Sequence, residues 1–269
     1  MAIQIDVMRT YPRELGNELI HHSTGFLDSS VRCSETTTQA DLWRREEFLV
    51  REEAKSSKTG ATGNRRLHDG VQLLIATLIL LLTAAPIDAS DVSEFETDVF
   101  RLLNELPGVF YGPMWAVMQL GNLLVVPAVA LIALLSRRFR LAAALGASGS
   151  LAWLLAKALK VVVERGRPAE LISDVVLRNA PAAGNGYISG HAAVVVALVT
   201  VAAPYFSRTA RIVMWVLAGL VCIGRVYVGA HLPLDVIGGG AFGLALGSLV
   251  NLLLSIRLHA RKSEMGSEA

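Results

Sequence analysis

The stretch GYISGHAAVVVALVTV, Gly186 to Val201, places a serine, a glycine and a histidine directly before an apolar run. If the run forms a helix, Ser189, Gly190 and His191 lie at its N-terminus, where backbone N–H groups have no partner within the helix. These N–H groups and the positive end of the helix dipole favour an anion. The triplet therefore predicts an anion site. The structural alternative is that Ser189 caps the helix and His191 lies at an interface.

Two cations are spaced seven residues apart in the stretch KVVVERGRP, at the end of another apolar segment. Lys160 and Arg167 would lie on one face of a helix, two turns apart, if the helix continues that far. Both could then contact the same anion. The alternative is that they are snorkelling residues, with apolar stems in lipid and charged groups in water.

A third polar cluster, GRVYVGAHLPLD, contains Arg225, His231 and, four residues after the histidine, Asp235. A carboxylate that accepts a hydrogen bond from one imidazole nitrogen fixes the tautomer and leaves the other nitrogen as a nucleophile or base. Pro233 is well placed to open the helix that follows. The cluster predicts a reactive histidine, with a purely structural role as the alternative.

The three clusters together offer three cations, two histidines, one carboxylate and one helix N-terminus. Such a set suits phosphoryl transfer, because fixed positive charge and backbone donors hold the phosphate oxygens while one group attacks and another protonates the leaving oxygen. A metal site is the weaker interpretation, since the cations would repel a divalent ion and the nearby carboxylates are only Glu164, Asp174 and Asp235. We therefore expect neither a metal nor a cofactor.

The composition indicates an all-α membrane protein. Of 269 residues 53% are hydrophobic and only 18% charged, which is too apolar for an ordinary soluble domain of this size. The net charge of +2, without a basic tract that carries aromatics, excludes a nucleic-acid partner. Cys33 and Cys222 lie in unlike settings and predict neither a disulfide nor a metal cluster.

Six apolar segments approach the length of about 20 residues that a membrane-spanning helix requires. They are Val71 to Pro86, Trp115 to Leu135, Leu141 to Val163, His191 to Phe206, Ile212 to Val228 and Val236 to Ile256. We expect one six-span domain over residues 71–256. Residues 1–70 are charged and rich in Ser and Thr, and predict a cytoplasmic, partly disordered tail with a short helix over Asp41 to Lys55. Residues 257–269 predict a basic cytoplasmic C-terminal tail.

The basic loops predict the orientation, because Lys and Arg near span ends favour the cytoplasmic side. Arg65 and Arg66 precede the first segment, and SRRFR, SRTAR and RLHARK follow the second, fourth and sixth. This places both termini in the cytoplasm and all three polar clusters on the extracytoplasmic side of a plasma (inner) membrane. No signal-peptide pattern opens the sequence, so the first segment is expected to remain as an anchor.

Two further patterns concern packing. The stretch SDVSEFETDVFRLLNELP, between the first two segments, has apolar residues at helical spacing and predicts an amphipathic helix on the outer membrane surface, capped by Ser90 or Ser93. Gly239, Gly243 and Gly247 repeat every four residues in the last segment. This small-residue stripe predicts close helix packing.

At the three polar clusters the sequence resembles the type 2 phosphatidic acid phosphatase superfamily of membrane lipid phosphatases, over about Val71 to Ile256. The first family motif, lysine, six residues, then Arg-Pro, is matched by Lys160, Arg167 and Pro168. The second motif, Pro-Ser-Gly-His, and the third, Ser-Arg, five residues, histidine, three residues, aspartate, are matched except that Ile188 replaces the proline and Gly224 replaces the serine.

The resemblance implies a role for each residue of the motifs. Phosphate would be bound by the following groups: Lys160, Arg167, Arg225 and the backbone at Ser189 and Gly190. His231, oriented by Asp235, would attack phosphorus to give a phosphohistidine. His191 would protonate the leaving group, and water would then release inorganic phosphate without a metal.

The substrate implied is a lipid phosphate that enters from the bilayer, either a polyprenyl phosphate or diphosphate or a lipid like phosphatidic acid. Two alternatives remain open at this point. The same site could transfer the phosphate from the histidine to another acceptor, as a lipid-linked phosphotransferase. Alternatively, the chain could be a non-catalytic lipid-binding scaffold in which Ile188 and Gly224 mark a degenerate site.

Overall fold

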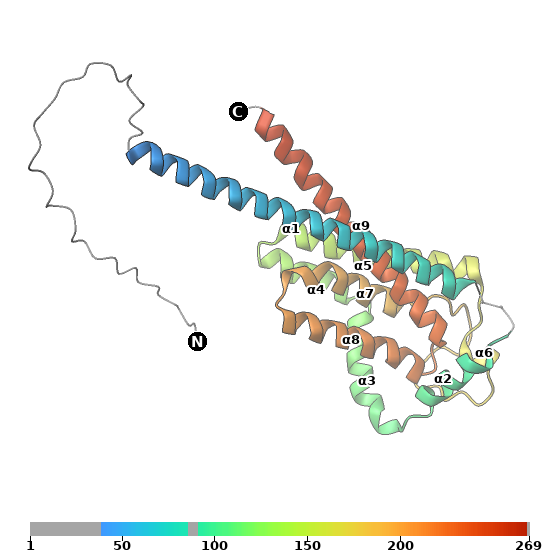
Figure 1. The fold of residues 1–269 in the computed structure, drawn as a ribbon. Helices are drawn as coiled ribbons and strands as arrows, with labels where there is room; N and C mark the ends of the chain where they lie inside the picture. Colours follow the sequence, from blue (N-terminus) through green and yellow to red (C-terminus); the bar gives the residue numbers. More distant parts are fainter. Residues whose placement is uncertain (1–38, 86–90, 268–269) are drawn as a thin grey trace, which may run out of the picture. The chain divides into compact units, whose positions relative to one another are not determined.

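The computed structural model describes residues 39–85 and 91–267, and every regular element in these two ranges is helical (Figure 1). The α-helices are α1 Gln39–Ala84, α2 Glu94–Asn104, α3 Tyr111–Met118, α4 Val125–Leu135, α5 Phe139–Val163, α6 Pro168–Leu171, α7 Gly190–Ala202, α8 Arg208–Tyr227 and α9 Pro233–Ser267. Three 3₁₀ turns, η1 Gly108–Phe110, η2 Gln119–Gly121 and η3 Ala203–Tyr205, complete the set. The predicted all-α class is confirmed for this part of the chain.

The chain divides into two compact units, Met1–Lys55 and Ser56–Ala269, and the candidate spans all lie in the second. The predicted short helix over Asp41 to Lys55 lies within α1, which continues without a break to Ala84. Good helix formers such as Arg, Glu, Leu, Ala and Lys dominate this stretch, so a helix there needs no tertiary support to be favoured. The predicted disorder of residues 1–38 and the cap Ser90 lie outside the described residues.

Among the described residues, four helical segments have the length and hydropathy of a membrane span: Arg66–Ala84, Phe139–Leu171, Arg208–Tyr227 and Pro233–Leu254. A bent pair, Gly108–Gly121 with Val125–Leu135, counts as a fifth if it is one span. Gly190–Tyr205 is apolar but shorter. The chain is therefore a multi-pass membrane protein with four or five candidate spans by these criteria, and the count of six stays a prediction.

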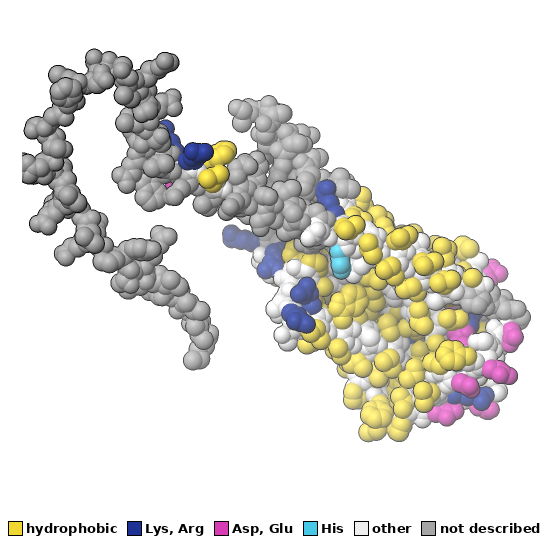
Figure 2. Space-filling model, viewed as in Figure 1, with side chains coloured by type: hydrophobic (Ala, Val, Ile, Leu, Met, Phe, Trp, Pro, Cys, Tyr) yellow, Lys and Arg dark blue, Asp and Glu magenta, His cyan; other side chains and the backbone are white. Residues whose placement is uncertain are grey.

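The outer face of these helices is apolar, as Figure 2 shows for one side of the molecule. Leu74 is 70% exposed, Ile132 64% and Val162 78%. Apolar side chains exposed on this scale would be unfavourable in water but suit contact with lipid tails. The surface thus agrees with the membrane assignment made from hydropathy.

The predicted span Trp115 to Leu135 is not one straight helix, because it bends by 63° between α3 and α4. The side chain of Asn122 accepts a hydrogen bond from the N–H of Leu124 at 3.2 Å, a local bond that competes with helix continuation. Gly121 faces the start of α7, where an added Cβ would lie 2.8 Å from the carbonyl oxygen of His191. The break therefore brings the second predicted span against the polar triplet.

Helix α7 lies at the centre of the second unit, and its residues from Ala192 to Val201 are all buried. It packs against α5, α8 and α9. Cβ atoms added to the glycine stripe of α9 would meet α7 and its N-cap directly. A Cβ on Gly239 would lie 2.5 Å from the Ser189 carbonyl oxygen, and one on Gly247 would lie 2.7 Å from the Thr200 Cβ. A Cβ on Gly243 would meet the Ala193 carbonyl oxygen. The predicted packing role of the glycine stripe is confirmed.

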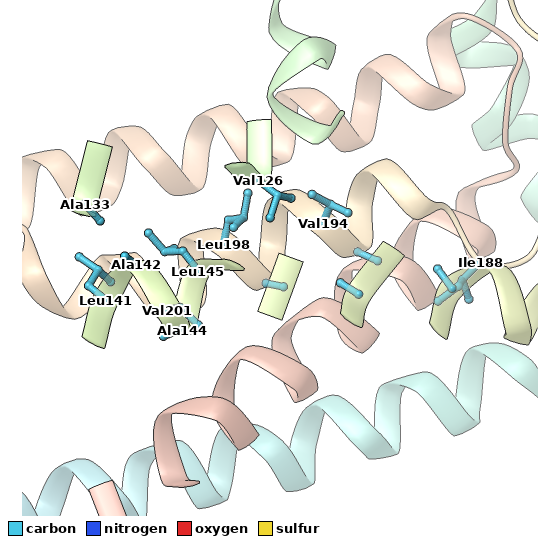
Figure 3. Close-up of a cluster of buried hydrophobic side chains, with 14 of the residues drawn as sticks. Val126, Ala133, Leu141, Ala142, Ala144, Leu145, Ile188, Val194, Leu198 and Val201 are labelled. Carbon is cyan, nitrogen blue, oxygen red and sulfur yellow. The ribbon is translucent and has the colours of Figure 1, made fainter. Parts of the chain in front are cut away.

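On its other side α7 shares a core with α4 and α5, in which Val126, Leu145, Val194 and Leu198 are buried together (Figure 3). Gly149 of α5 permits this contact, because an added Cβ would lie 2.6 Å from a methyl group of Val126. Close packing on several sides fixes the position of α7, and with it the position of the triplet at its N-terminus.

The predicted amphipathic helix is present as α2, with Ser93 as its cap: the Ser93 hydroxyl accepts from the N–H of Glu96 at 3.3 Å. Its buried residues are Phe100 and the polar Glu96 and Asn104, whereas Phe95 and Leu102, which belong to the predicted apolar face, are exposed. The Asn104 amide donates to the carbonyl oxygens of Val176 and Tyr227, at 3.0 Å each. Helix α2 is thus joined to its neighbours by buried polar contacts in addition to apolar ones.

Candidate active site

The polar triplet lies at the start of α7, as predicted, but Ser189 does not cap the helix through its side chain. The Ser189 Oγ atom is buried and has no hydrogen-bond partner among the described residues. Its backbone N–H donates to the carbonyl oxygen of Asp235 at 2.8 Å. An added Cβ on Gly190 would meet no atom within 4 Å, so the space beside the helix start is open. The hydroxyl of Ser189 and the N–H of Gly190 remain as groups that could contact an anion.

Lys160, near the C-terminal end of α5, points to the loop that precedes α7. Its Nζ donates to the carbonyl oxygens of Asn185 and Gly186, at 2.9 Å each. The Asn185 side chain donates in return to the Lys160 carbonyl oxygen at 2.7 Å. An ammonium group has three N–H donors, so one remains for a ligand.

Arg167 reaches the site in a way that the sequence analysis did not predict. Helix α5 ends at Val163, and Glu164 adopts the left-handed conformation with φ 46°. The helix therefore does not continue to Arg167, and the condition under which Lys160 and Arg167 would share one helix face is not met. After this turn the Arg167 Nη1 donates to the carbonyl oxygen of Ala230 at 2.9 Å. The guanidinium thus contacts the residue that directly precedes His231.

His231 and Asp235 are both buried, at 3% and 0% exposure, and α9 begins at Pro233 between them as predicted. The His231 Nδ1 and the Asp235 Oδ2 are 3.6 Å apart, which is beyond hydrogen-bonding distance. The expected hydrogen bond is thus absent from this structure, although the carboxylate faces the ring. The Asp235 Oδ2 accepts instead from the N–H of Leu232 at 2.9 Å.

The imidazole of His231 is surrounded by positive charge. Burial first, and then the charges of Lys160, Arg225, Arg167 and the neighbouring His191, lower the pKa of His231 well below its ordinary value. The ring is therefore neutral at neutral pH, the form in which an imidazole nitrogen can act as a nucleophile. The same interactions show that the residues of the three sequence clusters meet around one histidine.

Arg225 lies in the last turn of α8, and its carbonyl oxygen accepts from the N–H of Ala230 at 3.1 Å. The Nε atoms of Arg225 and Arg167 are buried, and neither has a hydrogen-bond partner within residues 39–85 and 91–267. Buried guanidinium donors of this kind match the oxygens of a phosphate. Together with Ser189 and Gly190, they are candidate donors for an anion.

Two residues at the site were missed by the sequence analysis, Arg165 and Glu96. Arg165 is 1% exposed, and its Nη1 donates to the Asp235 Oδ1 at 2.9 Å. Its Nη2 donates to the Glu96 Oε2 at 2.6 Å. Glu96 lies four residues before Phe100 and shares its buried helix face, a face that the predicted apolar pattern did not include.

The two departures from the family motifs have a structural setting. Ile188 is fully buried within the core beside α7 (Figure 3), and the peptide bond that precedes it is cis. At Gly224 an added Cβ would lie 2.7 Å from the Met118 Cγ and 3.0 Å from the Met114 Sδ. A serine at 224 would therefore collide with α3, so glycine at this position fits the close packing of α3 against α8.

The fold and the site define a class: a multi-pass helical membrane protein with a buried cluster of cations and histidines beside a helix N-terminus. Residues 138–257, which contain all the predicted site residues, match the model of the PAP2 superfamily. An undecaprenyl-diphosphatase of Sulfolobus acidocaldarius is 30% identical over 177 residues, which cover 64% of this chain and 84% of that protein. This chain belongs to the PAP2 superfamily of membrane lipid phosphatases.

Two crystal structures have a similar fold. LpxE of Aquifex aeolicus is 23% identical and aligns over 64% of this chain and 99% of its own, with a TM-score of 0.52. A PAP2-type phosphatidylglycerolphosphate phosphatase of Bacillus subtilis is also 23% identical and aligns over 67% and 94%, with a TM-score of 0.56. At this level of identity the two structures support the fold alone.

Proposed function

We propose that this protein hydrolyses the phosphate or diphosphate head group of a polyprenyl lipid through a phosphohistidine, without a metal. The observation that carries the proposal is the position of Lys160, Arg167 and Arg225 around the buried, neutral His231. The similarity to an undecaprenyl-diphosphatase favours a polyprenyl substrate over phosphatidic acid.

In the proposed mechanism the three cations hold the phosphate oxygens and neutralise their charge. Because the N–H of Ser189 donates to Asp235, the hydroxyl of Ser189 and the N–H of Gly190 serve as the remaining donors. These cations and hydrogen-bond donors also stabilise the negative charge on the phosphate oxygens in the transition state. This stabilisation lowers the barrier to phosphoryl transfer.

His231 attacks phosphorus through Nε2, because its Nδ1 faces Asp235. The N–P bond forms while the P–O bond to the leaving group breaks, and His191 donates a proton to the leaving oxygen. Water then attacks the phosphohistidine, His191 accepts its proton, and inorganic phosphate is released. The carboxylate of Asp235 stabilises the positive charge that the ring acquires.

An apolar cleft of about 670 Å³ between α4, α5, α7 and α8 supports a substrate with a long tail. It begins at Leu120, next to Gly121, which contacts His191. It extends towards Ser136 and Arg138 at the other end of the helices. A lipid whose head group lies at His231 could therefore place its tail in this cleft.

We further propose six spans, with the site on the extracytoplasmic side. Within the second unit, Figure 2 shows Asp and Glu side chains gathered at the end that carries α2, and Lys and Arg side chains at the opposite end of the helices. Basic residues favour the cytoplasmic side, so this separation supports cytoplasmic termini. In this arrangement the short α7 would be one of the six spans, and α3 and α4 together would form another.

The test is release of inorganic phosphate by the full-length protein in detergent, with chelator present. The substrates are polyprenyl diphosphate, polyprenyl monophosphate, phosphatidic acid and phosphatidylglycerol phosphate. We expect release from the polyprenyl lipids that His231→Ala abolishes and that His68→Ala, a change at an exposed histidine of α1, leaves intact. Label on His231 without phosphate release would favour the phosphotransferase, and absence of both would favour the scaffold.

A further inference from the structure

A buried chain of ionic hydrogen bonds extends from α2 to Asp235. The Arg165 Nη1 donates to the Asp235 Oδ1 at 2.9 Å and to the Glu96 Oε1 at 3.2 Å, and its Nη2 donates to the Glu96 Oε2 at 2.6 Å. Glu96, Arg165 and Asp235 are exposed by only 4%, 1% and 0%. No step of the mechanism above uses Glu96 or Arg165.

Each member of this chain fixes the next. Glu96 is held by the N–H of Leu234, which donates to its Oε1 at 2.9 Å, and it holds the guanidinium of Arg165 through two oxygens. Arg165 then holds the Oδ1 of Asp235. With Oδ1 held there and Oδ2 held by the Leu232 N–H, both carboxylate oxygens are fixed, and Oδ2 lies 3.6 Å from the His231 Nδ1.

The charges explain why this arrangement matters for a phosphate site. Asp235 lies among three cations that the phosphate requires, and an unrestrained carboxylate would attract Lys160 or Arg167 away from the ligand. Arg165 satisfies Asp235 with a separate positive charge. Glu96 neutralises Arg165 in turn, so the pair orients Asp235 without adding net charge beside His231.

Stability alone gives little reason for such a chain. Removing ions from water is costly, and replacement of a buried ion pair by apolar side chains of similar size is often neutral or stabilising. A role in orienting a reacting group accounts for it better.

We propose that Glu96 and Arg165 are positioning residues that hold Asp235, and through it the tautomer of His231, so that the Nε2 of His231 is free to attack. The inference rests on the proposed function. It also makes α2, expected as a helix of the membrane surface alone, a part of the catalytic unit.

The first variant is Glu96→Gln, which keeps the side-chain shape and an oxygen for the Leu234 N–H but removes the charge. The matched control is Glu94→Gln, two residues earlier on the exposed face of α2. We expect kcat to fall by about 10- to 100-fold in Glu96→Gln, with KM changed less than about twofold, because a misplaced reacting group lowers the rate of the chemical step. Glu94→Gln should match the unmodified protein.

A double variant, Glu96→Leu with Arg165→Met, separates positioning from folding. If the hydrogen bonds from Glu96 through Arg165 to Asp235 only join helices, the double variant with its apolar pair of side chains should keep both the thermal midpoint and kcat. On our proposal the midpoint stays within a few degrees while kcat falls as in Glu96→Gln. Wild-type kcat in a folded double variant would overturn the proposal.

A second measurement does not depend on turnover. Nitrogen-15 NMR of histidine-labelled protein, with His231 assigned by comparison with His231→Gln, reports which ring nitrogen carries the proton. We expect the proton on Nδ1 in the unmodified protein and a mixture of tautomers in both variants. If no lipid yields phosphate, the proposed function fails and the tautomer alone decides this inference; an unchanged tautomer would overturn it.

Discussion

At the scale of single residues, the surroundings of His231 decide what it can do. Burial and four neighbouring positive or ionisable groups keep its ring neutral, and Asp235 faces one of its two nitrogens. A histidine in water would be partly protonated near pH 6.5 and would rotate freely. In the proposed mechanism, one tautomer presents its Nε2 to the phosphate.

The depressed pKa of His231 has a consequence for stability. The unfolded chain binds a proton at this residue below about pH 6.5, but the folded protein does not, so the free energy of unfolding falls as pH decreases, by up to about 1.4 kcal/mol per pH unit. His231→Gln removes this contribution. We expect the apparent thermal midpoint in detergent to fall less between pH 7 and pH 5 in His231→Gln than in the unmodified protein; equal falls would contradict the assigned direction.

Ser189→Ala distinguishes the two interpretations of the serine. A helix cap contributes about 1 kcal/mol to stability, and its removal would lower the thermal midpoint. Since the Ser189 Oγ has no partner among the described residues, we expect an unchanged midpoint and a fall in kcat/KM of about three- to tenfold, the value of one neutral hydrogen bond to the substrate. Thermal melts and phosphate-release kinetics on the same preparation measure both quantities. A lower midpoint with unchanged kcat/KM would favour the cap.

At the scale of elements, the site is assembled from the ends of helices. Helix α7 supplies the N-terminus, α5 and the turn after it supply Lys160 and Arg167, α8 supplies Arg225, and the start of α9 supplies Asp235. The break between α3 and α4 brings Gly121 against His191, and the neighbouring Leu120 lines the apolar cleft.

The proposed position of the lipid tail can be tested with a variant whose larger side chain fills the cleft. Val129 of α4 lines the cleft, whereas Leu131 on the same helix is 53% exposed and does not. We expect Val129→Trp to raise KM for a long polyprenyl diphosphate by about tenfold or more, since burial of each CH₂ of a tail contributes about 0.8 kcal/mol. A short-chain diphosphate should be affected much less, and Leu131→Trp should leave both unchanged. Equal effects of Val129→Trp on the two substrates would show that the tail lies elsewhere.

Several elements could be predicted from the sequence because their signals are local. Hydropathy located the apolar helices, the four-residue glycine repeat located a close-packing face of α9, and Ser93 was one of two predicted caps for α2. The bend at Gly121 and the end of α5 at Glu164 were not predicted. Both depend on contacts or backbone conformations that arise only when distant segments meet.

At the scale of the whole molecule, the motifs located the candidate site but not the groups that support it. Lys160, Arg167, Arg225, His231 and Asp235 were found because their types and spacing match phosphate chemistry. Arg165 and Glu96 are 69 residues apart in the chain, and neither spacing nor periodicity relates them. Their pairing is a property of the folded chain.

The central claim is that phosphate passes through His231, and it is tested most directly by trapping the intermediate. The full-length protein is mixed with polyprenyl diphosphate labelled with ³²P in its terminal phosphate, denatured in alkali within milliseconds, and mapped for label. We predict label on His231 in the unmodified protein and none in His231→Ala. Phosphate release without label on His231, or release that persists in His231→Ala, would contradict the account.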